Sequence, residues 1–175
     1  MPGSCGTRRH RQPGSGTCAC RVAFLARVLA VAAALAGCGA GSSGAAAPKY
    51  EVRAGTVAGL GKILVDGQGL TLYMYGPDHR GRSRCSGFCA DQWPPLVLPR
   101  GVTRPKAGLG VRASLLGTVR RSNGSWQETY NRWPLYLWQG DTSPGEATGQ
   151  ADDMGLWYVL SVSGAVDTRT PLSGS

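Results

Sequence analysis

Histidine is nearly absent from this chain. The only two are His10 and His79, and His10 lies in the expected signal peptide, so the single histidine that remains excludes a duplicated catalytic site built on histidine. Ser114 and Ser125 have no general base near them in the sequence, and no glycine-rich phosphate-binding loop follows an expected strand. These absences weigh against the common hydrolases and nucleotide-binding enzymes. We therefore expect a protein without enzymatic activity.

Long regular segments are also absent. After residue 38 no stretch keeps a helical apolar period for three turns. The uninterrupted apolar run at residues 28–37 is too short to span a bilayer. The 27 glycines and 11 prolines favour short strands joined by many turns. An all-β fold is the expectation.

Two hairpins are predicted. The first covers residues 62–75, with its turn at residues 66–69. The second covers residues 117–130, where Asn123-Gly124 is the strongest short hairpin signal. Segments rich in aromatic and branched side chains predict further strands at residues 134–139 and 156–162.

The beginning of the chain has the pattern of a signal peptide. Residues 1–21 are basic without an acidic residue, and an apolar centre follows. That centre ends in Leu-Ala-Gly-Cys, which resembles the bacterial lipobox, in which the peptide is cut before a cysteine that carries lipid. We therefore expect a signal peptide at residues 1–37 and lipidation at Cys38. Two or more acyl chains anchor a protein stably, so the expected location is the extracytoplasmic face of the cell membrane.

A flexible tether is expected after the anchor. Residues 39–48 have no charge and no large side chain, and residues 38–54 are predicted to form the lipidated cysteine and a linker. The net charge of +9 falls to +4 beyond Cys38, because five of the 19 basic residues precede it and 14 remain against 10 acidic residues. Nucleic acid is therefore not an expected partner, whereas anionic lipid or an envelope polymer is compatible with this charge.

Only Cys85 and Cys89 remain after the signal peptide and the lipidated cysteine. An exported protein is expected to pair such cysteines, and Gly87 allows the tight backbone path of a short bridge. A redox-active pair or a metal site is the alternative. His79 and Met74 are, like the two cysteines, ligand types suited to copper. The three arginines at positions 80, 82 and 84 disfavour a cation there and would instead lower a thiol pKa.

The chain contains an internal repeat. Both halves read Leu-Tyr-x-aromatic-x-x-Asp, and a tryptophan follows the aspartate at nearly the same distance: Trp93 after 15 residues and Trp157 after 16. The motif residues are Tyr73, Tyr75 and Asp78 in the first copy and Tyr136, Trp138 and Asp141 in the second.

These residues resemble a family of predicted bacterial lipoproteins built from a tandem secreted repeat with the signature Tyr-x-(Phe/Trp/Tyr)-x-x-Asp. The cysteine pair followed by Trp-Pro-Pro-Leu at residues 93–96 is similar to the first repeat of that family. The resemblance implies a location and an architecture but no reaction, because the family has no settled activity. The predicted divisions are repeat 1 at 55–98, a connection at 99–113, repeat 2 at 114–163 and a disordered tail at 164–175. Two repeats too small to bury their own faces would pack into one pseudo-symmetric sandwich or barrel.

The repeated motif has two interpretations. In the first, its aromatic side chains are core packing and each aspartate caps backbone amides in a turn. In the second, the rings form a platform flanked by the aspartate carboxylate, which would hold a sugar or a cationic group. The acidic pair Asp152-Asp153 is more typical of a solvated turn than of a weak calcium site.

The leading functional expectation is a binding module for an envelope component or a small ligand, acting through the motif residues. The alternative is a thiol-redox or copper-handling protein centred on Cys85 and Cys89. A packing or assembly role with no small ligand is a third hypothesis. An envelope polymer or a membrane protein is the expected kind of partner.

Overall fold

The computed structural model describes residues 46–170. The predicted signal peptide and the predicted lipidation site Cys38 lie outside these residues. No helix in the part of the chain that the structure describes has the length and hydropathy needed to cross a membrane.

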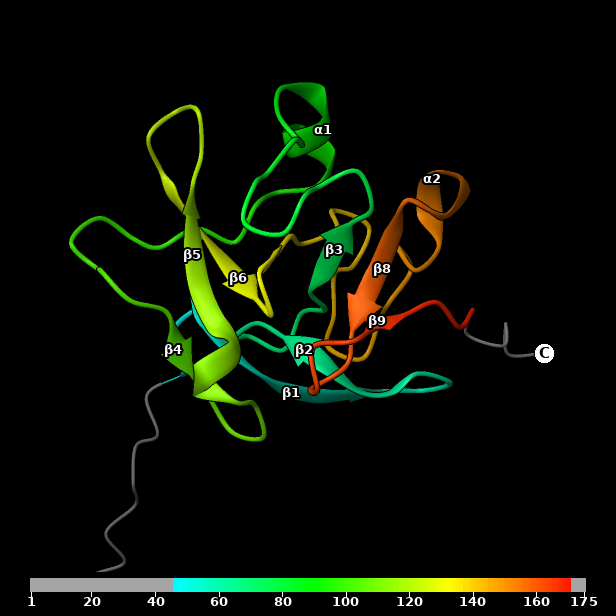
Figure 1. Cartoon of the computed structure of the whole chain (residues 1–175). Coiled ribbons are helices and arrows are strands. Elements are labelled where there is room, and N and C mark those ends of the chain that lie inside the picture. Colours follow the sequence, from blue (N-terminus) through cyan, green and yellow to red (C-terminus); the bar gives the residue numbers. More distant parts are fainter. Residues whose placement is uncertain (1–45, 171–175) are drawn as a thin grey trace, which may run out of the picture. The chain divides into compact units, whose positions relative to one another are not determined.

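Short strands dominate the described residues, and the helices are single turns (Figure 1). The sequence pattern of glycine-punctuated, aromatic and branched segments produces this outcome, and the expected all-β class is confirmed. In chain order the elements are β1 (Glu51–Val57), β2 (Gly61–Val65), β3 (Tyr73–Tyr75), α1 (Phe88–Gln92), β4 (Lys106–Ala107), the 3₁₀ helix η1 (Ala113–Leu115), β5 (Leu116–Arg120), β6 (Trp126–Tyr130), β7 (Trp133–Pro134), α2 (Asp152–Gly155), β8 (Trp157–Leu160) and β9 (Val166–Asp167).

The strands form three small sheets, with the orders β2-β1-β4, β3-β8-β9 and β5-β6-β7. All pairs are antiparallel except β1 with β4. The predicted second hairpin is confirmed as β5–β6, whose turn places Gly124 at φ 85°. The predicted first hairpin is shorter than expected: Val65 bridges Thr71, but β3 then leaves β2 to pair with β8.

Each repeat contributes strand pairs that complete the other repeat. Tyr73 in the first repeat is paired with Val159 in the second, and Tyr136 in the second is bridged to Pro95 in the first. A second pair of bridges, Ile63 with Ser161 and Val97 with Gln127, relates the repeats in the same way. The two copies are therefore interlocked around a pseudo-two-fold axis rather than placed side by side.

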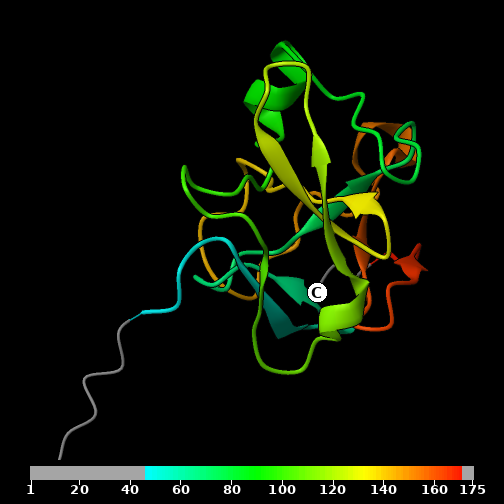
Figure 2. The ribbon, with the colours of Figure 1, turned by 60° about the vertical axis from the view of Figure 1, so that its left-hand side comes forward.

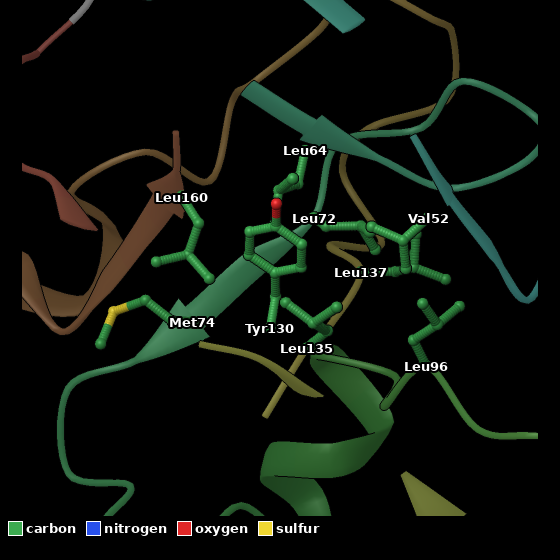
Figure 3. Close-up of a cluster of buried hydrophobic side chains, with 9 residues drawn as sticks. All are labelled: Val52, Leu64, Leu72, Met74, Leu96, Tyr130, Leu135, Leu137 and Leu160. Carbon is green, nitrogen blue, oxygen red and sulfur yellow. The ribbon is translucent and has the colours of Figure 1, made fainter. Parts of the chain in front are cut away.

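Two apolar clusters fill the interior. The first gathers side chains from both repeats, and in Figure 3 Tyr130 lies between Leu160 and Met74 on one side and Val52 and Leu137 on the other. Its hydroxyl is satisfied, since it donates to the carbonyl of Val162 at 2.8 Å and accepts from the amide of residue 112 at 3.0 Å. The second cluster contains the tyrosines and tryptophans of the repeated pattern.

Two of the predicted boundaries are wrong. The flexible linker was expected to reach residue 54, but β1 begins at Glu51 and pairs with both β2 and β4. The disordered tail was expected from residue 164, but Val166–Asp167 form β9 against β8. Both segments are short, and backbone pairing orders them: β9 pairs with the neighbouring β8, and the start of β1 pairs with the distant β4.

Candidate functional site

Hydrogen bonds between the repeats cross at the centre of the molecule. The Tyr73 hydroxyl of repeat 1 donates to the Asp141 carboxylate of repeat 2 at 2.6 Å. The Tyr136 hydroxyl of repeat 2 donates to the Asp78 carboxylate of repeat 1 at 2.7 Å. The two tyrosines also exchange backbone hydrogen bonds of 2.8 and 2.9 Å, and all four residues are buried. We call these the crossed Tyr–Asp pairs.

The second oxygen of each carboxylate holds a loop. Asp78 Oδ1 accepts from the backbone amide of Arg84 at 2.6 Å. Asp141 Oδ1 accepts from both the amide and the hydroxyl of Thr148, at 2.8 and 2.7 Å. Burial raises the pKa of Asp78, against the opposing effects of the Tyr136 hydroxyl and the Arg84 amide. The carboxylates are thus structural acceptors, as in the first interpretation of the motif.

Burial also changes the pKa of the two tyrosine hydroxyls that donate in the crossed pairs. It is the largest cause that raises the pKa of Tyr73 and of Tyr136, and the partner carboxylates raise both values further. Both phenols therefore keep their proton across the physiological range and remain donors in the crossed pairs.

Four aromatic rings form a continuous stack beside the crossed pairs. Trp93 and Trp157, the equivalent tryptophans of the two repeats, lie face to face with ring centres 3.9 Å apart and planes inclined by 4°. Tyr75 stacks on the free side of Trp157, and Trp138 stacks on the free side of Trp93, both at 4.3 Å. We call these four rings the aromatic stack.

The edges of the stack rest on the crossed pairs. Tyr73 meets Trp93 edge to face at 5.3 Å, and Tyr136 meets Trp157 in the same way at 5.2 Å. Each such contact contributes about 0.5–1.5 kcal/mol beyond the area that it buries. Every ring contact in one repeat thus has a counterpart in the other, and the hydrogen bonds and the stack fix each other's position.

The aromatic stack borders a pocket of about 280 Å³, which we call the aromatic slot. Its other walls come from α1 and α2, which lie on either side of β3 and β8 in Figure 1. Phe88, 78% exposed, belongs to the α1 side. The additional lining residues are Phe88, Cys89, Gln92 and Asp153.

The α2 side of the slot has a strained backbone. Ala151, Asp153 and Met154 have φ angles of 61°, 50° and 57°, a left-handed conformation that costs free energy for residues other than glycine. This turn contains Asp153, which lines the slot and is exposed. The only charged residue that lines the slot is therefore outside the repeated motif.

The structure divides the predicted motif into two parts. Tyr75 and Trp138 line the slot, as the platform interpretation requires, whereas Asp78 and Asp141 are buried below it. The similar spacing of Trp93 and Trp157 after the two aspartates marks them as equivalent residues but does not assign them to a site. Asp153 had been assigned to a solvated turn, and nothing in the sequence signals Gln92 or Phe88.

The predicted disulfide between Cys85 and Cys89 is confirmed. Its sulfurs differ in environment: Cys85 is 1% exposed in the second apolar cluster, and Cys89 lines the slot. Closing so short a loop stabilises the folded protein by about 2 kcal/mol.

His79 lies 3.0 Å from the Arg84 guanidinium, and within residues 46–170 no three His, Cys, Asp or Glu side chains gather as metal ligands. The redox and copper roles stay predictions.

An all-β module of two interlocked copies, with an aromatic slot between them, is the class that this geometry defines. A family model described as a secreted repeat of unknown function matches residues 56–97 and again 117–161. The chain belongs to this family of tandem secreted repeats, which confirms the resemblance seen in the sequence and places the protein outside the cytoplasm. Comparison with curated proteins and with solved structures gave no match.

Proposed function

We propose that this protein is a membrane-anchored, extracytoplasmic binding module that holds a small ligand or one unit of an envelope polymer in the aromatic slot. The observation that carries the proposal is the aromatic stack itself. Four large rings, two from each repeat, border one pocket together with one carboxylate. Concave sites with aromatic walls and a few polar groups are the usual form of ligand sites.

The chemistry of the walls favours a saccharide unit. Aromatic side chains pack well against the apolar face of a sugar ring, and a carboxylate accepts hydrogen bonds from its hydroxyls. Asp153 and Gln92 would supply these polar contacts. A cationic group held by the rings and Asp153 is the other chemistry that fits. A volume of about 280 Å³ favours one ring-sized group of a longer ligand.

Titration calorimetry on the full chain tests the slot. The probes are soluble β-linked N-acetylglucosamine oligomers for the saccharide class and tetramethylammonium for the cation class. Asp153→Asn and Trp138→Ala are each expected to weaken binding roughly tenfold or more, because each removes a direct contact. Trp126→Ala is the matched control, since Trp126 is 49% exposed on β6 and does not line the slot.

The outcome also separates the two chemistries. A saccharide that binds while tetramethylammonium does not supports the favoured ligand class, and the reverse supports the cationic one. Failure of both probes would contradict the proposal, as would unchanged binding by Asp153→Asn and Trp138→Ala proteins that unfold at the wild-type temperature.

The anchor is tested independently of the slot. The wild-type protein is expected in the membrane fraction and its Cys38→Ala variant in the soluble fraction, because lipidation requires the thiol at that position. The comparison is an immunoblot of fractionated cells, and intact mass of the wild-type protein identifies the lipid. Retention of Cys38→Ala on the membrane would contradict the lipid anchor.

A further inference from the structure

A second pocket lies on the other side of the disulfide loop. Its volume is about 370 Å³, and the tip of the β5–β6 hairpin forms one wall, near α1 in both views (Figures 1 and 2). The lining residues are Arg82, Ser83, Cys85, Ser86, Arg120, Arg121 and Ser122. We propose that this pocket, the arginine pocket, binds a phosphate group.

The arginine pocket has positive charge without a bound counterion from the protein. Three arginines line it and no acidic residue does. The two ion pairs found among the described residues lie elsewhere, between Lys106 and Glu51 and between Arg169 and Asp167. The Asp78 carboxylate is 3% exposed and bonded to Tyr136 and the Arg84 amide, and the charge of Arg121 counteracts the rise of its pKa that burial causes. The Arg120 guanidinium lies over the Trp126 ring, 6.0 Å from its centre, and no acidic side chain lines the pocket, so the potential there is positive.

The floor of the pocket is rigid. Arg121 donates to Ser83 Oγ at 2.8 Å, to Gln127 Oε1 at 2.6 Å and to the Cys85 carbonyl at 2.6 Å. Ser83 is in turn 2.7 Å from the Tyr136 hydroxyl of the crossed pairs. These contacts hold one guanidinium in a fixed orientation before any ligand arrives, which lowers the entropy cost of binding.

The fold does not require basic residues in the loop at residues 79–85, which contributes Arg82 to the arginine pocket. The equivalent loop of repeat 2, residues 142–153, contains no lysine or arginine and has three acidic residues, yet it is held by the same kind of aspartate acceptor. In repeat 1, residues 79–85 contain three arginines. The two copies hold equivalent loops with opposite charge, so the side chain of Arg82, the one arginine of this loop that lines the pocket, is not needed to hold the loop.

Phosphate is the anion that fits these donors. Its several oxygens can accept from more than one planar guanidinium and from serine hydroxyls at the same time, and arginine is the side chain best suited to such contacts. A carboxylate ligand has only two oxygen atoms, and both lie in one plane, so it can accept hydrogen bonds from fewer of these donors than a phosphate can. Soluble phosphate esters, including units of phosphorylated polymers, and phospholipid headgroups both present this group.

The test uses the chain from residue 38 onward with Cys38→Ala, so that neither the basic, apolar signal peptide nor the lipid contributes to binding. Calorimetry with glycerol 3-phosphate probes the soluble source. Vesicles of phosphatidylcholine with phosphatidylglycerol, against phosphatidylcholine alone, probe the lipid source. Arg82→Gln with Arg120→Gln is expected to weaken binding roughly tenfold or more. The matched control, Arg100→Gln with Arg104→Gln, removes the same charge from exposed positions outside the arginine pocket.

Each outcome decides the proposal. Tight binding of glycerol 3-phosphate supports a soluble phosphate ester, and binding only to phosphatidylglycerol vesicles supports a lipid headgroup, provided that the pocket variant loses it and the control keeps it. Equal loss of binding in both double variants would show that net charge alone drives the binding, and this would overturn the proposal. Absence of binding to either source, or equal affinity for acetate, would overturn the proposal. Arg121 is left intact because its hydrogen bonds also support the fold.

Discussion

The Asp141→Ala variant is expected to unfold with a free energy about 3–5 kcal/mol lower than that of the wild type. Three donors lose their acceptor at once: the Tyr73 hydroxyl and both the amide and hydroxyl of Thr148. Tyr73 is fully buried, so its hydroxyl cannot turn to water instead. Chemical denaturation measured by tryptophan fluorescence gives the value.

Less disruptive substitutions test whether the loss of stability comes from the crossed Tyr–Asp pair. Tyr73→Phe removes one donor and leaves Thr148 bonded, so we expect a loss of about 1–3 kcal/mol. A double-mutant cycle of Tyr73→Phe with Asp141→Asn should show coupling between the two repeats. Asp91→Asn, at an exposed position, is the matched control and should change little. Losses no greater in Asp141→Ala than in Asp91→Asn would show that the crossed pairs do not hold the repeats together.

The free energy of unfolding is also expected to fall as the pH rises from about 4.5 to about 8, because of Glu128. Both carboxylate oxygens of this residue are buried without a hydrogen-bond partner, and burial raises its pKa to about 8 from the ordinary 4.5. The folded chain therefore binds this proton more tightly than the unfolded chain. Its contribution is fully present below pH 4.5 and is lost at about 1.4 kcal/mol per pH unit up to about pH 8.

Glu128→Leu isolates this contribution, since an apolar side chain of similar size has no charge to bury. At pH 9 we expect the variant to be more stable than the wild type by about 3–5 kcal/mol, and its pH profile to be flatter over the same range. Burial also raises the pKa values of Asp66 and Asp78, but this contribution is the same in both proteins and cancels in the comparison. Parallel profiles for the two proteins would show that Glu128 is solvated or paired when the chain is folded.

Much of the local structure follows from local sequence. Asn123-Gly124 predicts the β5–β6 hairpin because a glycine in the turn accepts a positive φ, and the observed value is 85°. The cysteine spacing predicts the disulfide, because export favours pairing and the spacer contains a glycine. The repeated motif predicts equivalent roles for its two copies, and their contacts are equivalent.

The pairing between the copies could not be predicted, because one sequence contains no distance between residues 63 positions apart. Periodicity places Tyr73 and Tyr136 in strands but does not say that each hydroxyl reaches the aspartate of the other repeat. The same limit hides the order of Glu51 and Val52, which pair with the distant strand β4. The position of Asp153 beside the slot could not be predicted for a different reason. Its backbone is left-handed, and no glycine stands at that position to indicate such a conformation.

The architecture explains why two copies are needed. The motif strand of each repeat pairs with the segment after the other repeat's tryptophan, and the two tryptophans stack on each other. Neither copy alone has the partner for its buried tyrosine hydroxyl or the second half of the aromatic stack. The slot is consequently a product of the duplication, and the arginine pocket also takes residues from both repeats, from the disulfide loop of repeat 1 and from the β5–β6 hairpin of repeat 2.

The most direct test of the central claim is the spectrum of the indole N–H groups in the ¹⁵N-labelled full chain during titration with the N-acetylglucosamine oligomers. The chain has five tryptophans, three of which border the aromatic slot. A ligand in the slot should shift the resonances of Trp93, Trp138 and Trp157 and leave those of Trp126 and Trp133 in place. Shifts confined to Trp126 or Trp133, or no shift up to saturating oligomer, would contradict a saccharide site between the repeats.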